Sequence, residues 1–366
     1  MERNKIAHIA SRELESLGGI EAYLRNLYPL LIQNGFFPIL YIQSSEWGLI
    51  TYDDYEMVYI KAPKNKYVGK IFTGFVATLH VILLRRDVMV VHYHAMAAGL
   101  FSFLPKLFGF KVVFQGHGIE WQRAKWDGIS QKIIKLLDYF VLKLNNNIVM
   151  VSSDQALHLK KWINKNSTVI TPGVNIEDTL NDKEILQSFN LEKDKYILFL
   201  GRLVKEKRAD LLIDAFQKLD MNVGVSLVLV GEGEDKYVEQ LKSSVFSSNV
   251  LFLGSQFGNS KNVIMKHAKL FCIPSDLEGL PITLLEAMSF GKLCLASSIP
   301  ANIEALANTG IFFKQGSKDD LHLKLKLILS RSPENNLSEE AKKRAIKLFS
   351  WELVAKKIIE IYRGIT

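Results

Sequence analysis

The chain has 366 residues, 48% of them apolar, and a formal net charge of +8 at pH 7. This length is long for a single hydrophobic core and natural for two domains of common size. We find no RNA-binding pattern, zinc finger, secretory signal or apolar run long enough to cross a bilayer, so we expect a cytoplasmic protein that does not bind nucleic acid.

Short apolar runs alternate with amphipathic stretches through the first half of the chain. The runs predicted as strands are Lys5–Ala10, Phe37–Gln43, Met57–Lys61, Val88–His92, Lys111–Gln115, Asn147–Ser152 and Ser167–Ile170. The stretches with helical periodicity are Ile20–Gln33, Val68–Leu84 and Gln131–Leu144. Apolar strands separated by helices indicate a buried parallel sheet built from βαβ units.

A second series of the same kind follows a Pro-Gly break at Thr171–Asn175 and a polar stretch, Glu177–Lys195. Its predicted strands are Tyr196–Leu200, Ser226–Val230, Val250–Leu253, Leu270–Ile273, Lys292–Ala296 and Ile311–Phe313. The predicted fold class is therefore α/β, with two Rossmann-like, doubly wound domains facing each other across a cleft. They would comprise residues 1–173 and 174–349, and an amphipathic helix within 350–366 would pack back on the first domain.

The basic surplus belongs to the first half of the chain. Through Gly173 there are 20 Lys and Arg against 13 Asp and Glu, and the remainder has 26 against 25. An anionic membrane and a phosphate-bearing substrate are candidate partners, and a solvated basic face is the alternative. The cations that we expect at a membrane surface are Lys64, Lys66, Lys70, Arg85 and Arg86.

Two glutamates separated by seven residues, Glu278 and Glu286, mark the most informative stretch of the chain. The almost wholly apolar run Leu280–Met288 predicts a helix packed inside a domain, with Pro281 in its first turn. Glu286 would lie within this helix, where a carboxylate needs a partner. Glu278 would precede it, at the positive end of the helix dipole. Two such acids can bind the polyol ends of a ligand whose phosphates lie between them, which is the shape of a nucleotide sugar.

Two basic residues follow the predicted strand Tyr196–Leu200. Arg202 and Lys207 can both reach one diphosphate, the first as a planar fork and the second as a mobile point charge. A basic surface loop is the alternative. Paired glycines, Gly18 and Gly19, open the first long helix, where backbone N–H groups can close on a phosphate. A helix cap without a ligand is the alternative there.

A polar and aromatic cluster follows the fifth predicted strand. His117 lies between two glycines at the strand end, where it can approach a ligand, although structural hydrogen bonding is the usual role of an isolated histidine. Glu120, Arg123 and Lys125 lie among two tryptophans, of which Trp121 is the first. Trp faces stack on sugar rings, and an aromatic staple that holds the loop is the alternative.

Two observations limit the chemistry. The Gly231-Glu232-Gly233 turn lacks the third glycine and the downstream acid of a dinucleotide fingerprint, which disfavours NAD. Cys272 and Cys294 make neither a metal spacing nor a disulfide framework, so we expect buried structural thiols. No motif in the sequence requires a metal ion.

Together these residues resemble family 4 of the retaining glycosyltransferases, which have the GT-B fold. The resemblance spans nearly the full chain and rests on Glu278-x7-Glu286, the Arg202 and Lys207 pair, the Thr171–Val174 turn and Gly18-Gly19. The block around His117 resembles a subgroup of bacterial enzymes, rhamnosyltransferases among them, that build O-antigens and capsules on lipid carriers. One departure is Leu280, which stands where Phe-Gly often follows the first Glu-Gly.

The resemblance implies a role for each matching residue. Glu278 would contact the hexose hydroxyls of the donor, and Glu286 the ribose hydroxyls. Arg202 and Lys207 would neutralise the diphosphate, and His117 would lie beside the anomeric centre as a further catalytic residue. The remaining donor contacts would come from Gly18, Gly19, Gly254, Gly279, Leu280 and Pro281. The acceptor would contact Glu120, Trp121, Arg123 and Lys125.

The predicted function is transfer of a hexose from a nucleoside-diphosphate sugar, with a UDP-sugar favoured, to a polyprenyl-diphosphate-linked saccharide in O-antigen or capsule synthesis. The anomeric configuration would be retained, without a metal or another cofactor. The first domain would bind the acceptor, at the inner face of the cytoplasmic membrane, and the second the donor. The alternatives are a nucleotide-sugar epimerase on the same scaffold and a non-catalytic protein that binds sugar nucleotides or glycans.

Overall fold

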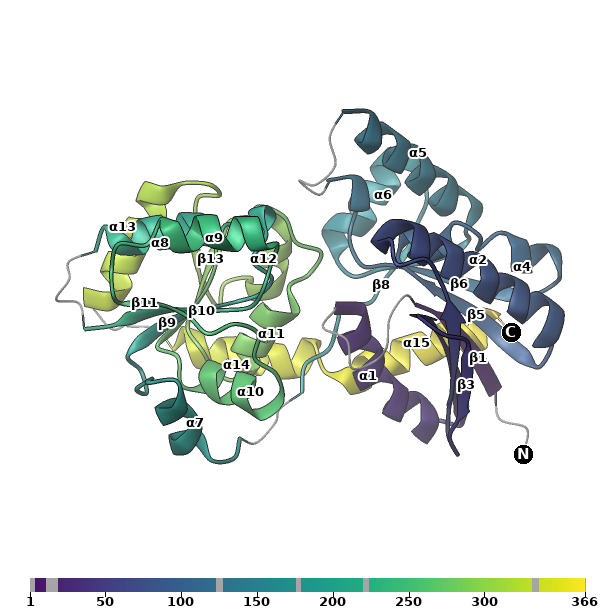
Figure 1. The fold of residues 1–366 in the computed structure, drawn as a ribbon, viewed down its shortest axis with the longest axis horizontal. Helices are drawn as coiled ribbons and strands as arrows, with labels where there is room; N and C mark the ends of the chain where they lie inside the picture. Colours follow the sequence, from purple (N-terminus) through teal and green to yellow (C-terminus); the bar gives the residue numbers. More distant parts are fainter. Residues whose placement is uncertain are drawn as a thin grey trace. The chain divides into compact units, whose positions relative to one another are not determined.

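The computed structural model describes residues 4–10, 19–122, 128–175, 179–219, 224–330 and 336–365. The chain divides into two compact units. The N-terminal unit comprises Met1–Gly173 together with Trp351–Thr366, and the C-terminal unit comprises Val174–Ser350. In Figure 1 the N-terminal unit is coloured from purple to teal and also contains the yellow C-terminal helix.

The N-terminal unit is built on a sheet with the strand order β3-β4-β2-β1-β5-β6-β7-β8. All of its pairings are parallel except that of β3 with β4. The edge strand β3 is not predicted from the sequence, because all of its residues are exposed and no alternation of apolar and polar residues marks it. The strands are β1 (Asn4–Ile9), β2 (Phe36–Ser44), β3 (Gly48–Thr51), β4 (Glu56–Lys61), β5 (Val88–His94), β6 (Lys111–Gly116), β7 (Asn147–Met150) and β8 (Thr168–Val169).

Helices cover both faces of this sheet (Figure 1). Ile6 of β1 contributes to the core on one face, and its neighbour Ala7 to the core on the other, because successive strand residues point to opposite faces. The first face is covered by α1 (Gly19–Gln33) and α15 (Trp351–Ile365). The second is covered by α2 (Lys66–Leu84), α3 (Met96–Gly99), α5 (Gly128–Leu144) and α6 (Ser153–Ile163), with α4 (Leu104–Leu107) beside α2.

The C-terminal helix α15 is part of the N-terminal core. Its buried stripe includes Trp351, Ile358 and Tyr362, which pack with residues of α1 and of the sheet. Trp351 also explains why residue 173, in the turn that ends the N-terminal segment, is a glycine. A Cβ atom on Gly173 would lie 2.6 Å from the indole ring, so a larger residue would push α15 away.

The C-terminal unit is built on a parallel sheet with the strand order β11-β10-β9-β12-β13-β14. Counted along the unit, this order is 3-2-1-4-5-6, which is typical of nucleotide-binding Rossmann domains. The order reverses between β9 and β12, and ligands bind such sheets outside the carboxyl ends of the strands at that point. The predicted α/β class with two Rossmann-like units is confirmed. The strands are β9 (Tyr196–Leu200), β10 (Ser226–Val230), β11 (Val250–Phe252), β12 (Leu270–Ile273), β13 (Cys294–Ser297) and β14 (Ile311–Phe313).

Helices cover both faces of this second sheet as well. The polar stretch 177–195 contains one of them, α7, whose single buried side chain is Leu186, so no apolar periodicity indicates it. One face is covered by α7 (Asp182–Ser188), α10 (Gly258–Lys266), α11 (Ile282–Ser289), α12 (Pro300–Leu306) and α14 (Leu337–Leu348). The other is covered by α8 (Ala209–Gln217), α9 (Asp235–Ser243) and α13 (Lys318–Ser330).

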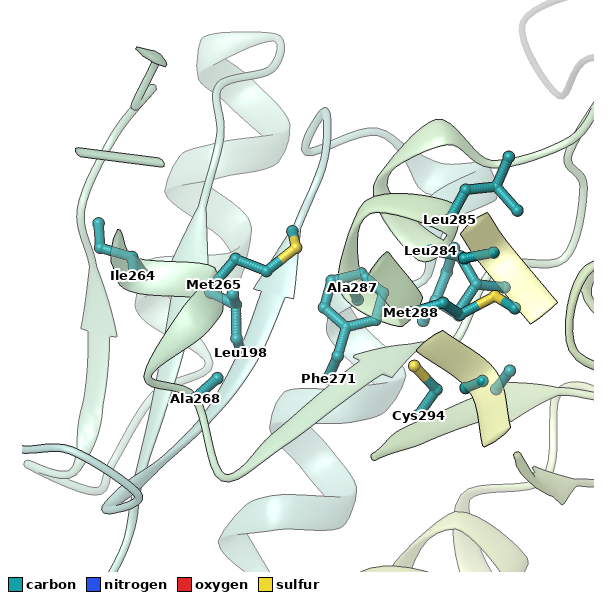
Figure 2. Close-up of a cluster of buried hydrophobic side chains, with 14 of the residues drawn as sticks. Leu198, Ile264, Met265, Ala268, Phe271, Leu284, Leu285, Ala287, Met288 and Cys294 are labelled. Carbon is teal, nitrogen blue, oxygen red and sulfur yellow. The ribbon is translucent and has the colours of Figure 1, made fainter. Parts of the chain in front are cut away.

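The predicted buried helix is α11. Its side chains Leu284, Ala287 and Met288 gather around Phe271 of β12, and Figure 2 shows this cluster together with Cys294 of β13. The helix begins at Ile282, two residues after the start of the predicted run, because Pro281 has an extended conformation and is the N-cap residue. Its carbonyl accepts the N–H groups of Leu284 and Leu285. The two cysteines are free and buried, as predicted.

Candidate functional site

The loops that follow β9 and β12 meet where the strand order of the C-terminal unit reverses, since β9 pairs directly with β12. The loop after β9 carries Arg202 and Lys207. The loop after β12 carries Glu278 and leads into α11. Residues that lie 71 positions apart in the sequence are therefore brought together by two neighbouring strands.

An ion pair joins the two loops. The Lys207 ammonium donates to both carboxylate oxygens of Glu278, over 2.5 and 2.6 Å, and the Ser275 hydroxyl donates to Oε1 of the same carboxylate over 2.7 Å. The Glu278 side chain is 7% exposed and that of Lys207 18%. Because water reaches these groups poorly, each charge depends on the other, and removal of one would leave its partner uncompensated.

The loop after β12 is held by further contacts that no local pattern predicts. The Asp276 carboxylate accepts from Arg208 over 2.9 Å, and its backbone N–H donates to the Glu206 carbonyl over 2.8 Å. The Ser297 hydroxyl of β13 donates to the Ser275 carbonyl over 2.5 Å. These contacts tie the loop to both neighbouring strands, which fixes the carboxylate that it carries.

The second predicted carboxylate, Glu286, lies half-buried on α11. It accepts from the Lys261 ammonium of α10 over 2.7 Å, and each of the two side chains is 22% exposed. The partner that a carboxylate in this helix needs is thus a lysine 25 positions earlier in the chain. No sequence spacing indicates that lysine, because α10 and α11 come together only where both pack on the same face of the sheet.

The other predicted donor contacts surround these pairs. Arg202 is the second residue after β9 and is exposed. Within the described residues its side chain has no hydrogen bond or ion pair, so it can bind an anion. Gly254 follows β11 with a φ of +65°, and its carbonyl accepts from the Gly231 N–H over 2.8 Å. Residues 279–281 join the loop to α11, and within them Leu280 and Pro281 are buried.

The N-terminal unit carries the remaining predicted residues. Gly19 is the first residue of α1, and a Cβ atom there would meet nothing within 4 Å; Gly18 lies outside the described residues. His117 follows β6. Its Nε2 lies 3.1 Å from Nδ1 of His94 in β5, and its ring packs edge-on against Tyr23 of α1.

The predicted acceptor residues are only partly described. Glu120 and Trp121 lie in the 3₁₀ turn η1 (Glu120–Gln122). The Trp121 ring packs edge-on against Trp162 of α6 at a centroid distance of 6.0 Å, and the Lys135 ammonium of α5 lies 4.5 Å from its centroid. These contacts hold the turn against α5 and α6. Arg123 and Lys125 lie outside the described residues.

A cluster of buried histidines lies where the strand order of the N-terminal sheet reverses. His8 of β1 pairs with His92 of β5, and His94 follows on the same face. His8 Nδ1 lies 3.0 Å from His94 Nε2, and His92 Nδ1 lies 2.7 Å from the Tyr362 hydroxyl. Burial lowers the pKa of His8 to about 3 and holds those of His92 and His94 well below their usual range, so all three are neutral at pH 7. The His-Tyr-His alternation in β5 was the only sequence signal of this cluster.

The buried carboxyl group of Asp138 on α5 should make the stability of the fold depend on pH. Burial, assisted by the negative charge of Glu120, raises the pKa of Asp138 to about 7. Because this value lies above that of the unfolded chain, the folded state binds the proton more tightly, and the resulting stabilisation is lost as the pH rises through 7. The ionised form is therefore a cost to folding at alkaline pH.

Asp138→Asn is expected to raise the free energy of unfolding at pH 8 by about 2–4 kcal/mol, because the amide cannot ionise and its oxygen still accepts the backbone N–H of Trp121. The gain is expected to shrink as the pH is lowered to 5. Urea denaturation of both proteins at the two pH values measures it. A variant no more stable than the wild type at pH 8 would contradict the assignment.

Two family models match the chain in succession. Residues 17–178 match the model described as Glycosyltransferase Family 4, and residues 181–347 match the model described as Glycosyl transferases group 1. The two matches meet close to the boundary between the two structural units. Each unit is therefore similar to a different glycosyltransferase model.

Known relatives match at modest identity. An uncharacterised glycosyltransferase of Methanocaldococcus jannaschii is 29% identical over 177 residues, which is 47% of this chain and 45% of that protein. A glycogen synthase of Thermodesulfovibrio yellowstonii is 28% identical over 201 residues, 52% of this chain and 40% of the synthase. The chain thus spans less than half the length of both. The O-antigen biosynthesis glycosyltransferase WbnH of Escherichia coli is 26% identical over 313 residues, 84% of this chain and 86% of WbnH.

Solved structures resemble the whole chain. Sucrose-phosphate synthase from Thermosynechococcus elongatus has a TM-score of 0.86 at 19% identity and covers 99% of both chains. HepE from Anabaena, solved with UDP and glucose, has a TM-score of 0.79 at 15% identity and covers 99% of this chain and 100% of HepE. These likenesses and the two Rossmann-like units define a protein of the GT-B fold.

Both halves of the chain thus match glycosyltransferase models, and O-antigen biosynthesis glycosyltransferases are among its relatives. No helix in the described parts of the chain combines the length and the hydropathy needed to cross a membrane.

Proposed function

We propose that the protein transfers a hexose from a nucleoside-diphosphate sugar to a polyprenyl-diphosphate-linked saccharide in O-antigen or capsule synthesis, with retention of the anomeric configuration. The observation that carries the proposal is the ion pair between Lys207 and Glu278 at the strand reversal of the C-terminal unit. It joins a cation suited to phosphate with a carboxylate suited to hydroxyl groups at the place where Rossmann sheets bind ligands. HepE, which binds UDP and glucose in its crystal, supports a UDP-sugar as the donor.

Donor binding would exchange the partners of this ion pair. Lys207 would move from the carboxylate to the diphosphate, which carries more negative charge, and Glu278 would then accept hydrogen bonds from the hexose hydroxyls. Arg202 would bind the same diphosphate. Glu286, held by Lys261, would accept the ribose hydroxyls. The acidic residues would thus lie at the two ends of the donor and the cations at its centre.

The reaction needs stabilisation of the leaving group, since negative charge builds on the diphosphate as the bond from the anomeric carbon to the phosphate oxygen breaks. Fixed cations at that position are often the largest catalytic contribution. The acceptor hydroxyl would attack from the same face, and the departing phosphate would take its proton. In this scheme no protein side chain acts as a nucleophile. Arg202 and Lys207 balance the negative charge of the diphosphate without a metal ion.

The proposal is tested with the purified chain in two steps. A thermal-shift screen against UDP-, GDP- and dTDP-sugars is expected to show stabilisation by one nucleotide class. Transfer to a lipid-linked saccharide is then followed by NMR of the new linkage, which is expected to keep the configuration of the donor. Binding without turnover across an acceptor panel would indicate a binding protein, consumption of donor without acceptor would indicate an epimerase, and an inverted linkage would refute same-face attack.

We propose that the acceptor is reached at an anionic membrane through the face of the N-terminal unit that carries α5, α2 and α4 (Figure 1). Apolar side chains, each about half exposed or more, recur every three or four residues along α5, and exposed lysines lie among them. A helix with an exposed apolar stripe and adjacent lysines is typical of binding in the membrane interface. The stripe comprises Ile129, Ile133, Leu136, Phe140 and Leu144, and the lysines are Lys132, Lys135 and Lys143.

The expected basic patch needs one correction. Arg85 is not available to lipid head groups, because it binds Glu56 over 2.6 Å and Asp87 over 3.2 Å and its side chain is only 14% exposed. Burial alone would lower the pKa of Arg85, but the two carboxylates outweigh burial and raise it, so the guanidinium stays charged and paired. Charge reversal at this position would break a structural ion pair rather than a membrane contact.

Ile133→Glu combined with Leu136→Glu is expected to reduce binding to vesicles of phosphatidylglycerol and phosphatidylethanolamine by about 100-fold, because two apolar side chains no longer enter the interface. Vesicle flotation measures the bound fraction. Leu323→Glu with Leu327→Glu, on the exposed face of α13 in the C-terminal unit, is the matched control and is expected to bind as the wild type does. Equal binding by all three proteins would refute the surface.

A further inference from the structure

Three histidines form a continuous line from the interior of the N-terminal sheet to His117. His8 Nδ1 lies 3.0 Å from His94 Nε2, and His94 Nδ1 lies 3.1 Å from His117 Nε2. His8 and His94 are almost completely buried. The line therefore starts at a buried ring and ends at His117, which the family resemblance places beside the anomeric carbon.

Neutral imidazoles in such a line have only two possible proton arrangements. Each ring has one N–H donor and one nitrogen acceptor, and every contact needs one of each. Either His8 donates to His94 and His94 donates to His117, or both contacts run the other way. In the first arrangement the remaining proton of His117 is on Nδ1, and in the second it is on Nε2. His8 and His94 are neutral because burial holds their pKa values well below 7.

The inner end of the line distinguishes the two arrangements. His8 Nε2 is buried and has no hydrogen-bond partner among the described residues. In the first arrangement this atom is a bare acceptor, whereas in the second it is an N–H donor with nothing to bind. Buried donors without a partner are rarer in proteins than acceptors without one, and an unpaired polar group costs about 1–3 kcal/mol. The first arrangement is therefore favoured.

We infer that His8 and His94 are positioning residues that fix His117 as the neutral tautomer protonated at Nδ1. His117 would then act on the substrate as a hydrogen-bond donor and not as a base. This role in transfer rests on the proposed function, but the tautomer does not. A hydrogen-bond donor at that position suits an oxygen of the nucleotide sugar that gains negative charge during transfer. It is also consistent with a mechanism in which the departing phosphate, and not His117, takes the proton of the acceptor hydroxyl.

A metal ion is the competing interpretation of the cluster. His8, His92 and His94 each offer a nitrogen within 4.8 Å of the others. Ligands of one ion point their lone pairs at a common centre about 2.0–2.1 Å away. Here the His92 ring is stacked on His94, with centroids 4.2 Å apart and planes 29° apart, so the nitrogens of these two rings do not face a common centre. The His8 and His94 rings are inclined by only 22° with centroids 5.3 Å apart, and the 3.0 Å contact between their nitrogens suits a hydrogen bond in the ring plane. The hydrogen-bonded line fits this geometry better.

Long-range ¹H–¹⁵N correlation spectra of the full chain, labelled with ¹⁵N-histidine and treated with EDTA, read the tautomers directly at pH 7.5. The expected spectrum shows His117 protonated at Nδ1 and bare at Nε2. A proton on Nε2, or an unbiased mixture, would overturn the inference. So would a stoichiometric change of the three buried histidines on addition of Zn²⁺, because it would identify the cluster as a metal site.

Two variants of nearly equal size test the positioning role. His94→Asn places an amide N–H close to the position of Nδ1–H, and it is expected to keep both the tautomer of His117 and a kcat within a few-fold of the wild type. His94→Leu removes the donor and is expected to release the tautomer preference and lower kcat by about 10–100-fold, with little change in KM for the donor sugar. His92→Asn lies off the line and is the control for a buried histidine.

The outcomes separate this inference from the proposed function. If the wild-type chain transfers no sugar, the proposed function fails, while the spectra still decide the tautomer. If transfer occurs but His94→Leu keeps the Nδ1 proton on His117, the positioning role is refuted. Melting temperatures show which variants are folded, and a destabilised His94→Leu leaves the wild-type and His94→Asn spectra as the decisive pair.

Discussion

Arg202→Ala is expected to lower kcat for hexose transfer by about 10²–10³-fold. The guanidinium is exposed at the end of β9 and has no partner among the described residues, so the substitution removes nothing that the folded chain uses. Its loss would raise the energy of the transition state, in which negative charge develops on the leaving diphosphate. The melting temperature is therefore expected to stay at the wild-type value, which separates catalysis from folding.

Lys207→Ala is expected to reduce the rate to a similar extent and also to destabilise the C-terminal unit, by about 3–5 kcal/mol, because it leaves Glu278 poorly hydrated and unpaired. Lys205→Ala is the matched control, since Lys205 is an exposed lysine in the same loop. Steady-state transfer rates and melting curves for the three single variants and for Arg202→Ala with Lys207→Ala give the comparison. A double variant that still transfers near the wild-type rate would refute the diphosphate assignment.

The free energy of unfolding is expected to fall steeply as the pH drops below 6.5. The pKa values of His8, His92 and His94 are lowered by burial. Below pH 6.5 these rings are therefore protonated in the unfolded chain but remain neutral in the folded chain. Stability is then complete above the unfolded pKa and is lost toward acid. Each such histidine contributes a slope that approaches about 1.4 kcal/mol per pH unit. Three together approach about 4 kcal/mol per pH unit, partly offset by Asp138, whose raised pKa acts in the opposite direction.

Urea denaturation between pH 7 and 5 measures this slope. His8→Asn removes one titrating ring and is expected to reduce the slope by about 1.4 kcal/mol per pH unit, whatever its effect at pH 7. His322, which is half-buried on α13 of the C-terminal unit, is the control position. A slope that is the same in wild type and His8→Asn would mean that His8 takes up a proton in the folded state.

Regular packing made the fold predictable. Runs such as Tyr196–Leu200 and Ser226–Val230 are buried on both faces of parallel sheets, so they are continuous apolar segments with observed bounds identical to the predicted ones. The edge strand β3 and the helix α7 bury almost nothing, and a pattern-based prediction has no apolar signal to use there.

Residues of the candidate site could be recognised from the sequence where a single element shows an unusual pattern. They could not be recognised where the contact joins elements that are distant in the sequence. Glu278 and Glu286 are prominent because acids flank and interrupt an apolar helix. Lys261, which pairs with Glu286, and Ser275, which binds Glu278, are ordinary residues until the sheet places them beside a carboxylate. The pairing of Arg85 with Glu56 could not be predicted for the same reason. Arg85 was expected as a surface cation, and it is part of a structural ion pair.

A crystal structure of the chain with its nucleotide sugar tests the central claim most directly. We expect the Glu286 carboxylate within about 3.2 Å of the ribose hydroxyls and the Glu278 carboxylate within the same distance of the hexose hydroxyls. Lys207 would have left Glu278 for the diphosphate. A nucleotide bound at another edge of the sheet, or a Glu278 that remains paired with Lys207 and touches no sugar, would contradict the account.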